Sequence, residues 1–364
     1  MQSLIELKNI SKAFGDTTVL DNFNLSVNEN EFITLLGPSG CGKTTTLRIV
    51  GGFETPDTGK VFFEGKDITD LAPNKRHINT VFQKYALFPH MNVGDNIAFG
   101  LKIKGKSDQY IRDKIKYALN LVNLSGYERR RIDSLSGGQQ QRIAIARAIV
   151  NEPKVLLLDE PLGALDLKLR QDMQYELIRL KNELGITFLY VTHDQEEAMA
   201  ISDQIAVMKD GVIQQIGRPK ELYHKPANEF VATFIGRTNI IPARLEKQAD
   251  GAYIVFEDGY SLRMPALDQV EEQAIHVSIR PEEFIRDENG PIDGTITDSV
   301  YLGLNTEYFI ETGFASKLQV SEESTFEEDL KKGDRVRLRI NTQKLNVFSE
   351  DGSRNLIKGV SHGA

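Results

Sequence analysis

Short apolar runs alternate with longer amphipathic segments over the first two thirds of the chain. Residues 32–36, 155–158 and 187–191 are almost entirely apolar or β-branched, as strands covered on both faces require. Segments 110–122 and 167–184 carry apolar residues at helical spacing, with charged residues on their other faces. This alternation predicts an α/β fold with a parallel sheet and crossover helices.

A two-residue turn is predicted near the end of this region. Asp210 and Gly211 follow the apolar run 205–208, after Lys209, and precede the apolar run 212–216. Asp-Gly between two such runs is a strong hairpin signal, so we expect two antiparallel strands here.

The pattern changes after about Gly236. Segments 252–256, 275–279 and 335–340 are short and alternating, and Asp-Gly, Asn-Gly and Lys-Gly-Asp turns lie between such segments. A period of two with frequent turns is typical of a small antiparallel β-domain, here expected to be a barrel. We therefore expect one domain over residues 1–236 and a second over residues 237–364.

The composition is that of a folded protein. The 364 residues are 40% hydrophobic and 26% charged, which argues against disorder. No run approaches the roughly 18 to 20 apolar residues of a membrane span, and the N-terminus lacks the basic and apolar regions of a signal peptide. Cys41 is the single cysteine, which excludes an internal disulfide and a cysteine-built zinc site. We expect a cytoplasmic location.

The net charge of −8 is unevenly distributed. Residues 238–364 hold 14 Lys and Arg against 23 Asp and Glu, whereas the first 237 residues hold 30 and 29. No basic block predicts nucleic-acid binding. The acidic second domain has two interpretations, a solubilising surface or a surface that attracts cations.

A phosphate-binding loop follows the first buried strand. Residues 37–44 fit the pattern G-x-x-x-x-G-K-[ST] and precede a helix expected over residues 44–50. Glycines let backbone N–H groups converge on phosphate oxygens, and the helix N-terminus favours their negative charge. Lys43 is expected to reach the β- and γ-phosphates. The residues expected to bind ATP here are Gly37, Pro38, Ser39, Gly40, Cys41, Gly42, Lys43, Thr44 and Thr45.

Two acidic residues end the second buried strand. Asp159 stands where phosphate-loop enzymes place a carboxylate on the Mg²⁺ side, together with the hydroxyl of Thr44. Glu160 follows directly, and a second carboxylate at this place polarises the attacking water. The alternative for Glu160 is an acid at a helix N-terminus before Pro161.

A second glycine motif, Ser136-Gly137-Gly138-Gln139, leads into a helical run over residues 140–150. A serine and two glycines at a helix N-terminus make a second phosphate site. One nucleotide does not need two γ-phosphate sites, so we expect the second motif to serve ATP held by another copy of the chain. This predicts a homodimer.

These motifs, in this order, resemble the nucleotide-binding subunits of ATP-binding-cassette (ABC) transporters over nearly the whole chain. The resemblance implies a phosphate-loop cassette with a RecA-like core, a helical subdomain at about residues 88–150, and an OB-like C-terminal β-domain. It also implies roles for single residues. Phe14 would stack on adenine, Gln83 would sense Mg²⁺ and the attacking water, and His193 would contact the γ-phosphate. Asp166 would couple the two sites. The opposite ATP would be contacted by Ser136, Gly137, Gly138 and Gln139. The implied Mg²⁺ residues are Thr44, Gln83 and Asp159, and the implied catalytic residues are Glu160, His193 and Gln83.

Within the family, the chain is most similar to importer ATPases of the spermidine/putrescine group. Segments 79–90, 159–166 and 278–282 carry this closer resemblance. It implies import of polyamines driven by ATP, on the cytoplasmic face of the membrane, with two integral-membrane permease subunits and, indirectly, a solute-binding protein. The apolar surface expected over residues 84–93 would receive a permease helix, with packing inside the helical subdomain as the alternative.

Other functions stay open from the sequence. The first two segments also occur, with small changes, in relatives that handle iron, sugars, sulfate or betaine. A soluble cassette ATPase of DNA repair or translation is less compatible, because those proteins tend to carry two cassettes, long insertions or zinc cysteines. The C-terminal domain is expected to support the dimer, or else to sense a ligand such as a polycation.

The position of Cys41 in the phosphate loop bears on the reactivity of its thiol. A small residue fits a tight turn, but a thiol at a helix N-terminus has a lowered pKa and is more reactive. We therefore predict that alkylation of Cys41 blocks ATP hydrolysis and that MgATP protects it.

Overall fold

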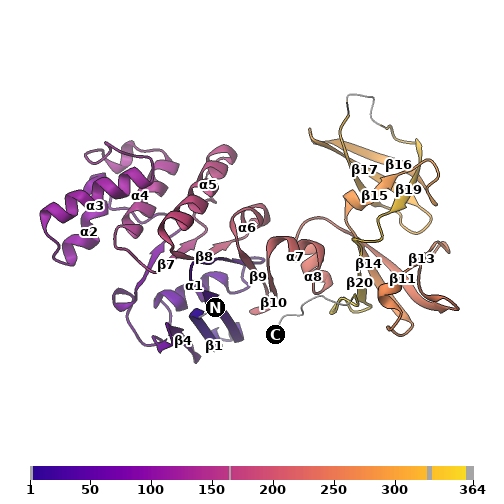
Figure 1. Cartoon of the computed structure of the whole chain (residues 1–364), viewed down its shortest axis with the longest axis horizontal. Coiled ribbons are helices and arrows are strands. Elements are labelled where there is room, and N and C mark those ends of the chain that lie inside the picture. The colour runs from indigo at the N-terminus through magenta and orange to yellow at the C-terminus, as the bar shows by residue number, and fades with distance from the viewer. Residues whose placement is uncertain (1–2, 164, 326–329, 358–364) are drawn as a thin grey trace. The chain divides into compact units, whose positions relative to one another are not determined.

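The computed structural model describes residues 3–163, 165–325 and 330–357. Its contacts group the chain into two units, Met1–Pro219 and Lys220–Ala364, each of which is described by itself (Figure 1). The expected domain boundary at residue 236 remains a prediction, whereas this grouping places residues 220–236 with the C-terminal unit.

A six-stranded sheet forms the centre of the first unit. Its strands pair in parallel except at the β9–β10 edge, where Lys209 pairs with Val212 in the predicted hairpin. The order across the sheet is β10 (Val212–Gly217), β9 (Gln204–Lys209), β3 (Phe32–Leu36), β8 (Thr187–Thr192), β7 (Val155–Asp159) and β6 (Ile78–Val81). The three predicted buried strands are confirmed as β3, β7 and β8.

Both faces of this sheet are covered, which explains the continuous apolar runs. Along β8, Leu189 and Val191 join one core while Phe188 and Tyr190 join the other. The first core also holds residues of α1 (Lys43–Gly51) and of a four-stranded antiparallel sheet. The second holds residues of α5 (Leu167–Leu184). The strands of the smaller sheet are β2 (Thr17–Asn28), β1 (Ser3–Phe14), β4 (Thr58–Phe63) and β5 (Lys66–Asp67), and the helix α6 (Gln195–Ile201) follows β8.

Three helices form a group with a core of its own. They are α2 (Val93–Ile103), α3 (Asp108–Leu121) and α4 (Gly137–Ile149), and Figure 1 shows them together at one end of the first unit. Val93, Ile97, Leu119 and Ile143 are all buried in their shared core. Single 3₁₀ turns lie at Pro73–Lys75 and Ile132–Ser134. The expected helical subdomain is therefore present in the first unit.

The C-terminal unit consists of two five-stranded antiparallel sheets around one core, preceded by two short helices. The helices are α7 (Pro219–His224) and α8 (Glu229–Phe234). The first sheet has the order β13 (Ser261–Arg263), β12 (Gly251–Val255), β11 (Asn239–Gln248), β14 (Gln273–Ile279) and β20 (Asn346–Ser349). The second has the order β15 (Phe284–Arg286), β19 (Arg335–Ile340), β16 (Ile292–Tyr301), β17 (Asn305–Thr312) and β18 (Leu318–Glu323), and 3₁₀ turns lie at Pro265–Leu267 and Pro281–Glu283. The predicted fold class, a cassette followed by an all-β domain, is confirmed.

Across the residues that the structure describes, every helix is too short or too polar to traverse a lipid bilayer.

Candidate functional site

The candidate site lies where four neighbouring parallel strands end. The predicted phosphate loop follows β3, Gln83 follows β6, Asp159 ends β7, and His193 follows β8. The carboxyl ends of parallel strands meet at one edge of a sheet, which is where open α/β sheets bind their ligands. The strand order therefore brings together residues that are far apart in the sequence.

Glycines give the phosphate loop its tight course between β3 and α1. Gly40 and Gly42 have φ angles of 82° and 99°, a region that side chains disfavour. Gly37 is needed for a different reason, because a Cβ there would lie 2.3 Å from the carbonyl oxygen of Met208. Lys43 is buried, and its Nζ donates hydrogen bonds to the carbonyl oxygens of Gly37 (2.7 Å) and Pro38 (2.9 Å). Its ammonium group thus lies against the loop where phosphates are expected.

The remaining loop residues differ in exposure. Pro38, Ser39 and Gly40 are exposed, whereas Thr44 and Thr45 are half-buried at the start of α1. The backbone of this loop is therefore open to a ligand on the side of residues 38–40.

Thr44 and Asp159 form an oxygen-rich pair. The Thr44 hydroxyl donates a hydrogen bond to Asp159 Oδ1 over 3.1 Å. Burial raises the pKa of the Asp159 carboxyl, and the bond from Thr44 opposes that rise. A hydroxyl and a carboxylate are ligands that suit Mg²⁺, which is usually held by one or two carboxylates and substrate phosphates. These residues fit the metal that the sequence implies.

Glu160 lies between the two other residues predicted to be catalytic. Gln83 Nε2 donates a hydrogen bond to Glu160 Oε2 over 3.2 Å, and His193 Nδ1 lies 3.2 Å from Glu160 Oε1. Glu160 has a φ angle of 43°, a left-handed conformation, and its backbone N–H donates to the carbonyl of Val191 over 3.0 Å. Such strain in a non-glycine residue is common at functional sites. The Glu160 carboxylate is therefore held in place by side chains that follow the two neighbouring strands, β6 and β8.

The second glycine motif begins α4, as predicted. The Ser136 hydroxyl accepts a hydrogen bond from the N–H of Gln139, whose side chain accepts one from the N–H of Ser136. This reciprocal capping box defines the helix start. In the described part of the chain, no hydrogen bond or ion pair joins residues 136–139 to residues 37–45. Among the described residues of one chain, the two glycine motifs are therefore not connected by a hydrogen bond or an ion pair.

Asp166 caps the N-terminus of α5, and its neighbour Leu169 lies close to this second motif. Its carboxylate accepts a hydrogen bond from the N–H of Leu169 over 2.9 Å. A Cβ on Gly138 would lie 2.6 Å from the side chain of Leu169, so the glycine permits a close approach of the two helix starts. Ala164, in the matched segment 159–166, lies outside the described residues.

Phe14, the residue expected to stack on adenine, is exposed. Its side chain is 49% accessible at the end of β1, and Lys12 Nζ lies 5.2 Å from the ring centre. Hydrogen bonding to Glu54 raises the pKa of Lys12, against the opposing effect of burial. An exposed ring beside a cation offers a flat apolar surface to a base.

The lowered pKa expected for the Cys41 thiol is contradicted, whereas the block of ATP hydrolysis by alkylation and its prevention by MgATP stay predictions. The side chain is only 3% accessible, and burial raises the pKa of the thiol even though Lys43 lies close by and opposes the rise. Loss of solvation disfavours the thiolate more strongly than the nearby positive charge favours it.

Arg170 contributes to the site but is not predicted by any motif. Its guanidinium group donates to Asp194 Oδ2 over 2.7 Å and to the carbonyl of Leu165 over 3.3 Å, so it joins the segment before Asp166 to the segment after His193. Beside it, the buried Glu197 accepts hydrogen bonds from Tyr190 and Thr192. Burial raises the pKa of Glu197. The sequence indicates a role for these residues only through their positions close to the motif residues Asp166 and His193.

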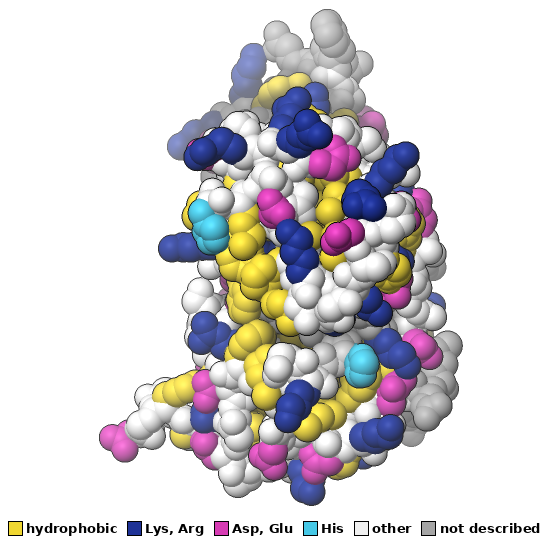
Figure 2. All heavy atoms as spheres, turned by 90° about the vertical axis from the view of Figure 1, so that its left-hand side faces the viewer, with side chains coloured by type: hydrophobic (Ala, Val, Ile, Leu, Met, Phe, Trp, Pro, Cys, Tyr) yellow, Lys and Arg dark blue, Asp and Glu magenta, His cyan; other side chains and the backbone are white. Residues whose placement is uncertain are grey.

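The apolar side chains of residues 84–93, expected at the surface, are only partly exposed. Tyr85 and Val93 are buried, whereas Leu87, Phe88 and Met91 are half-exposed. Figure 2 views the molecule from the side of the three-helix group and shows a band of hydrophobic side chains across this face. Part of the segment therefore packs inside, as the alternative interpretation held, and part remains available for a partner.

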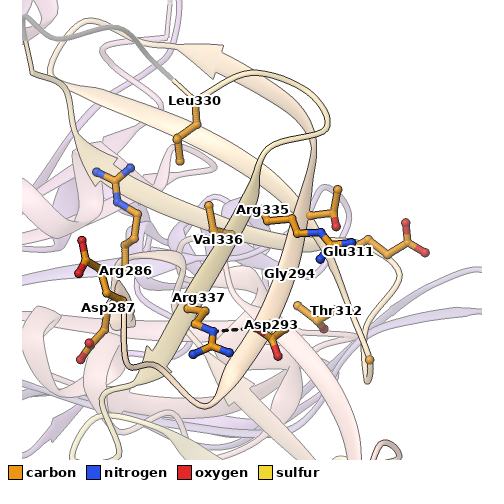
Figure 3. Close-up of a pocket in the computed structure, with 13 residues that line it drawn as sticks. Arg286, Asp287, Asp293, Gly294, Glu311, Thr312, Leu330, Arg335, Val336 and Arg337 are labelled. Atoms are coloured by element: carbon orange, nitrogen blue, oxygen red, sulfur yellow. Dashed lines mark hydrogen bonds and ion pairs between the residues drawn. The ribbon is translucent and has the colours of Figure 1, made fainter.

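A pocket of about 790 Å³ lies in the C-terminal unit (Figure 3). Its charged lining residues are Arg286, Arg335, Arg337, Asp287, Glu288, Asp293 and Glu311. Arg337 Nε pairs with Asp293 over 3.0 Å, so part of this charge is neutralised within the pocket. Among the described lining residues, the near balance of charge does not select a polycation.

Comparison with protein families identifies two matching regions. Residues 20–163 match the family described as ABC transporter, and residues 277–348 match the TOBE domain. These regions lie in the first and second structural units, respectively.

Individual relatives extend the match over most of the chain. The spermidine/putrescine import ATP-binding protein of Acetivibrio thermocellus is 55% identical over 313 residues, 85% of this chain and 87% of its own length. That of Clostridioides difficile is 56% identical over 316 residues, 84% of this chain and 88% of its own. The Fe(3+) ions import ATP-binding protein of Fusobacterium nucleatum is 47% identical over 367 residues, 99% of this chain and 97% of its own.

Solved structures match the first unit. The cbiO1 protein of Clostridium perfringens, part of an ABC transporter complex, superposes with a TM-score of 0.58 and 30% identity over 61% of this chain and 91% of its own. An ATP-binding cassette solved as a dimer in a post-hydrolysis state, bound to ADP and phosphate, gives a TM-score of 0.53 and 33% identity over 59% of this chain and 98% of its own.

Proposed function

This chain belongs to the ATP-binding proteins of ABC transporters, and from that premise we propose that it is the ATP-hydrolysing subunit of a polyamine importer. The observation that supports hydrolysis most directly is the convergence of Thr44, Asp159, Gln83, Glu160 and His193 at adjacent strand ends. Spermidine and putrescine are the proposed solutes because relatives named for their import are 55% and 56% identical to this chain.

Each group of site residues has a proposed role of its own. Lys43 and the loop N–H groups bind the phosphates of ATP, and Phe14 stacks on the adenine. Glu160 orients and polarises the attacking water, while Gln83 and His193 keep its carboxylate in position. Thr44 and Asp159 would hold Mg²⁺, with Gln83 close by, and the ion would neutralise charge on the phosphates.

We further propose that two copies act together. Residues 136–139 begin a helix, and a helix N-terminus favours a phosphate, yet among the described residues they make no bond to the phosphate loop of the same chain. A second copy facing the first would bring this motif to the nucleotide of its partner, and Asp166 would couple the two sites. The dimeric cassette with ADP and phosphate offers a precedent.

The remaining partners follow from the proposed role. A subunit that drives import would bind two integral-membrane permease subunits through the half-exposed residues Leu87, Phe88 and Met91. It would lie at the cytoplasmic face of the membrane, and a solute-binding protein would deliver the solute to the permeases. The C-terminal unit is proposed to support the dimer.

Ferric ion is the second candidate solute. The relative named for Fe(3+) import is less identical, at 47%, but the match covers 99% of this chain, including its C-terminal unit. The polyamine relatives match 84–85% of the chain.

Uptake by cells that lack this chain would separate the candidates. Labelled spermidine, putrescine and Fe³⁺ would be supplied to the deletion strain, restored with the wild type or with Lys43→Ala. We expect the wild type alone to restore polyamine uptake, because Lys43→Ala removes the cation that lies at the phosphate loop. Restoration of Fe³⁺ uptake instead would favour the second candidate, and unchanged uptake of all three solutes in the deletion strain would contradict both.

A further inference from the structure

Two consecutive residues just after Gln83 have a backbone conformation that side chains disfavour. Tyr85 has a φ angle of 59° and Ala86 one of 46°, although neither is glycine. A Cβ in this left-handed region lies too close to the following carbonyl oxygen, so both residues are strained. Such strain persists only where the surrounding structure holds it.

Arg147, on α4, supplies this restraint. Its Nη1 donates a hydrogen bond to the carbonyl oxygen of Ala86 over 2.8 Å, and its Nη2 donates to that of Tyr85 over 2.9 Å. The guanidinium carbon also lies 5.4 Å from the centre of the Phe88 ring. A guanidinium group is a rigid planar fork of donors, so it binds two adjacent carbonyls from two separate nitrogens in a fixed orientation, whereas an ammonium group has one nitrogen on a flexible stem.

Asn96, on α2, holds the other end of the same segment. Its side chain is fully buried, accepts a hydrogen bond from the N–H of Phe88 over 2.8 Å and donates one to the carbonyl of Phe88 over 3.1 Å. Helices α2 and α4 share one core, so residues 85–88 are attached to the three-helix group at both ends.

The residues on the other side of the strained turn are attached to the candidate site. Gln83 Nε2 donates to Glu160 Oε2 over 3.2 Å. The ring of Tyr85 is buried in the core beside the central sheet, and its hydroxyl donates to the carbonyl of Pro161 over 3.5 Å. The turn at Tyr85 and Ala86 thus connects Gln83, which is bonded to the candidate site, to Phe88, which is bonded to the three-helix group.

We infer that Arg147 is a positioning residue that couples Gln83 to the three-helix group. This role rests on the proposed transport function. The helix that carries Arg147 begins with residues 136–139, so a displacement of that end would be passed to Phe88 and its half-exposed neighbours, where the permease is proposed to bind. Without Arg147 the turn relaxes, and hydrolysis proceeds without driving transport.

The test uses the full chain assembled with its two permease subunits in proteoliposomes. Three quantities would be measured: hydrolysis by the isolated subunit, its stimulation by the permeases, and spermidine taken up per ATP hydrolysed. We expect Arg147→Lys to hydrolyse ATP within about twofold of the wild type when isolated, and to lose about tenfold in uptake per ATP. Arg142→Lys is the matched control, because Arg142 lies on the same helix and, within the described part of the chain, its side chain donates a hydrogen bond only to the carbonyl of Val122, over 3.3 Å.

A second substitution tests the strain itself. Glycine adopts a positive φ without a clash, so Ala86→Gly lowers the need for a restraint. The double variant Arg147→Lys with Ala86→Gly is expected to regain at least half of the lost uptake per ATP, and Arg147→Gln replaces Arg147→Lys if the lysine variant does not fold.

Three results would overturn the inference: unchanged uptake per ATP in the Arg147 variants, an equal fall of hydrolysis and uptake, or no recovery in the double variant. Absence of spermidine uptake by the wild type would instead count against the proposed solute. In that case, the comparison of permease-stimulated hydrolysis between the wild type and the Arg147 variants still tests whether Arg147 couples the site to the permeases.

Discussion

Among single residues, Glu160 is contacted at both oxygens of its carboxylate. Gln83 and His193 each contact one oxygen of its carboxylate, at 3.2 Å in both cases. This arrangement fixes the direction of the carboxylate. The charge, rather than the shape, is therefore what a substitution should remove.

We predict that Glu160→Gln lowers ATP hydrolysis by at least about 100-fold while ATP binding persists, because an amide cannot polarise water as a carboxylate does. Single-turnover hydrolysis measures the rate, and gel filtration with ATP measures accumulation of the dimer. Glu183→Gln is the control, since Glu183 pairs with Arg179 on the exposed side of α5. A normal rate in Glu160→Gln would remove Glu160 from its proposed role.

Cys41 gives a prediction of pH dependence. Burial raises the pKa of its thiol, so at neutral pH less of it is thiolate than in the unfolded chain. Alkylation by iodoacetamide should therefore be slower in the folded protein and should accelerate as the pH rises through the raised pKa. Because Cys41 is the single cysteine, mass spectrometry reads this rate without ambiguity. Equal rates in the folded and urea-unfolded chain at neutral pH would contradict the prediction.

Among the secondary-structure elements, two turns with similar backbone geometry have different surroundings. Gly65, between β4 and β5, has a φ angle of 74°, and Gly211, between β9 and β10, has one of 77°. A Cβ on Gly65 would meet open space, whereas a Cβ on Gly211 would lie 2.5 Å from the carbonyl oxygen of Val19. The first turn constrains only its own backbone, and the second also packs against a neighbouring strand.

We predict that Gly65→Ala costs about 1 kcal/mol of stability, the penalty for a left-handed alanine. Gly211→Ala should cost about 2–4 kcal/mol, because the backbone of Val19 must move as well. Urea unfolding of both variants measures the difference. Equal losses would mean that the approach of Val19 adjusts without cost.

At the scale of the whole molecule, residues 220–236 are attached to the C-terminal unit. Arg280, beside β14, donates hydrogen bonds to the carbonyls of Ala232 and Arg237, both over 2.9 Å, and to that of Tyr223 over 3.1 Å. Burial lowers the pKa of Arg280. His276 Nδ1 lies 2.6 Å from Glu229. A boundary at 219 therefore preserves contacts that a boundary at 236 would break.

Two fragments test this boundary. Residues 220–364 should unfold cooperatively in urea, whereas residues 237–364 should be less stable by about 2–4 kcal/mol, because Arg280 loses two of its carbonyl partners. Circular dichroism reports both transitions. Equal stability of the two fragments would favour the boundary at 236.

The sequence by itself determined the elements and the family. The strand over residues 32–36 and the helix over residues 167–184 have the predicted bounds, because apolar spacing and capping residues act within a few positions. The phosphate loop and the order of the motifs are likewise local, and the comparisons confirm the family that they indicated. The roles of the single site residues remain predictions.

Only the tertiary structure decided which distant residues meet and which are buried. Gln83 and His193 lie 77 and 33 positions from Glu160, and the order of the parallel strands brings them to it. The contacts of Arg147 with Tyr85 and Ala86 span about 60 positions. The raised pKa of Cys41 reverses what its place at a helix start suggested, because solvation depends on everything packed around the thiol. These properties belong to the packed chain and have no signal within a short segment of sequence.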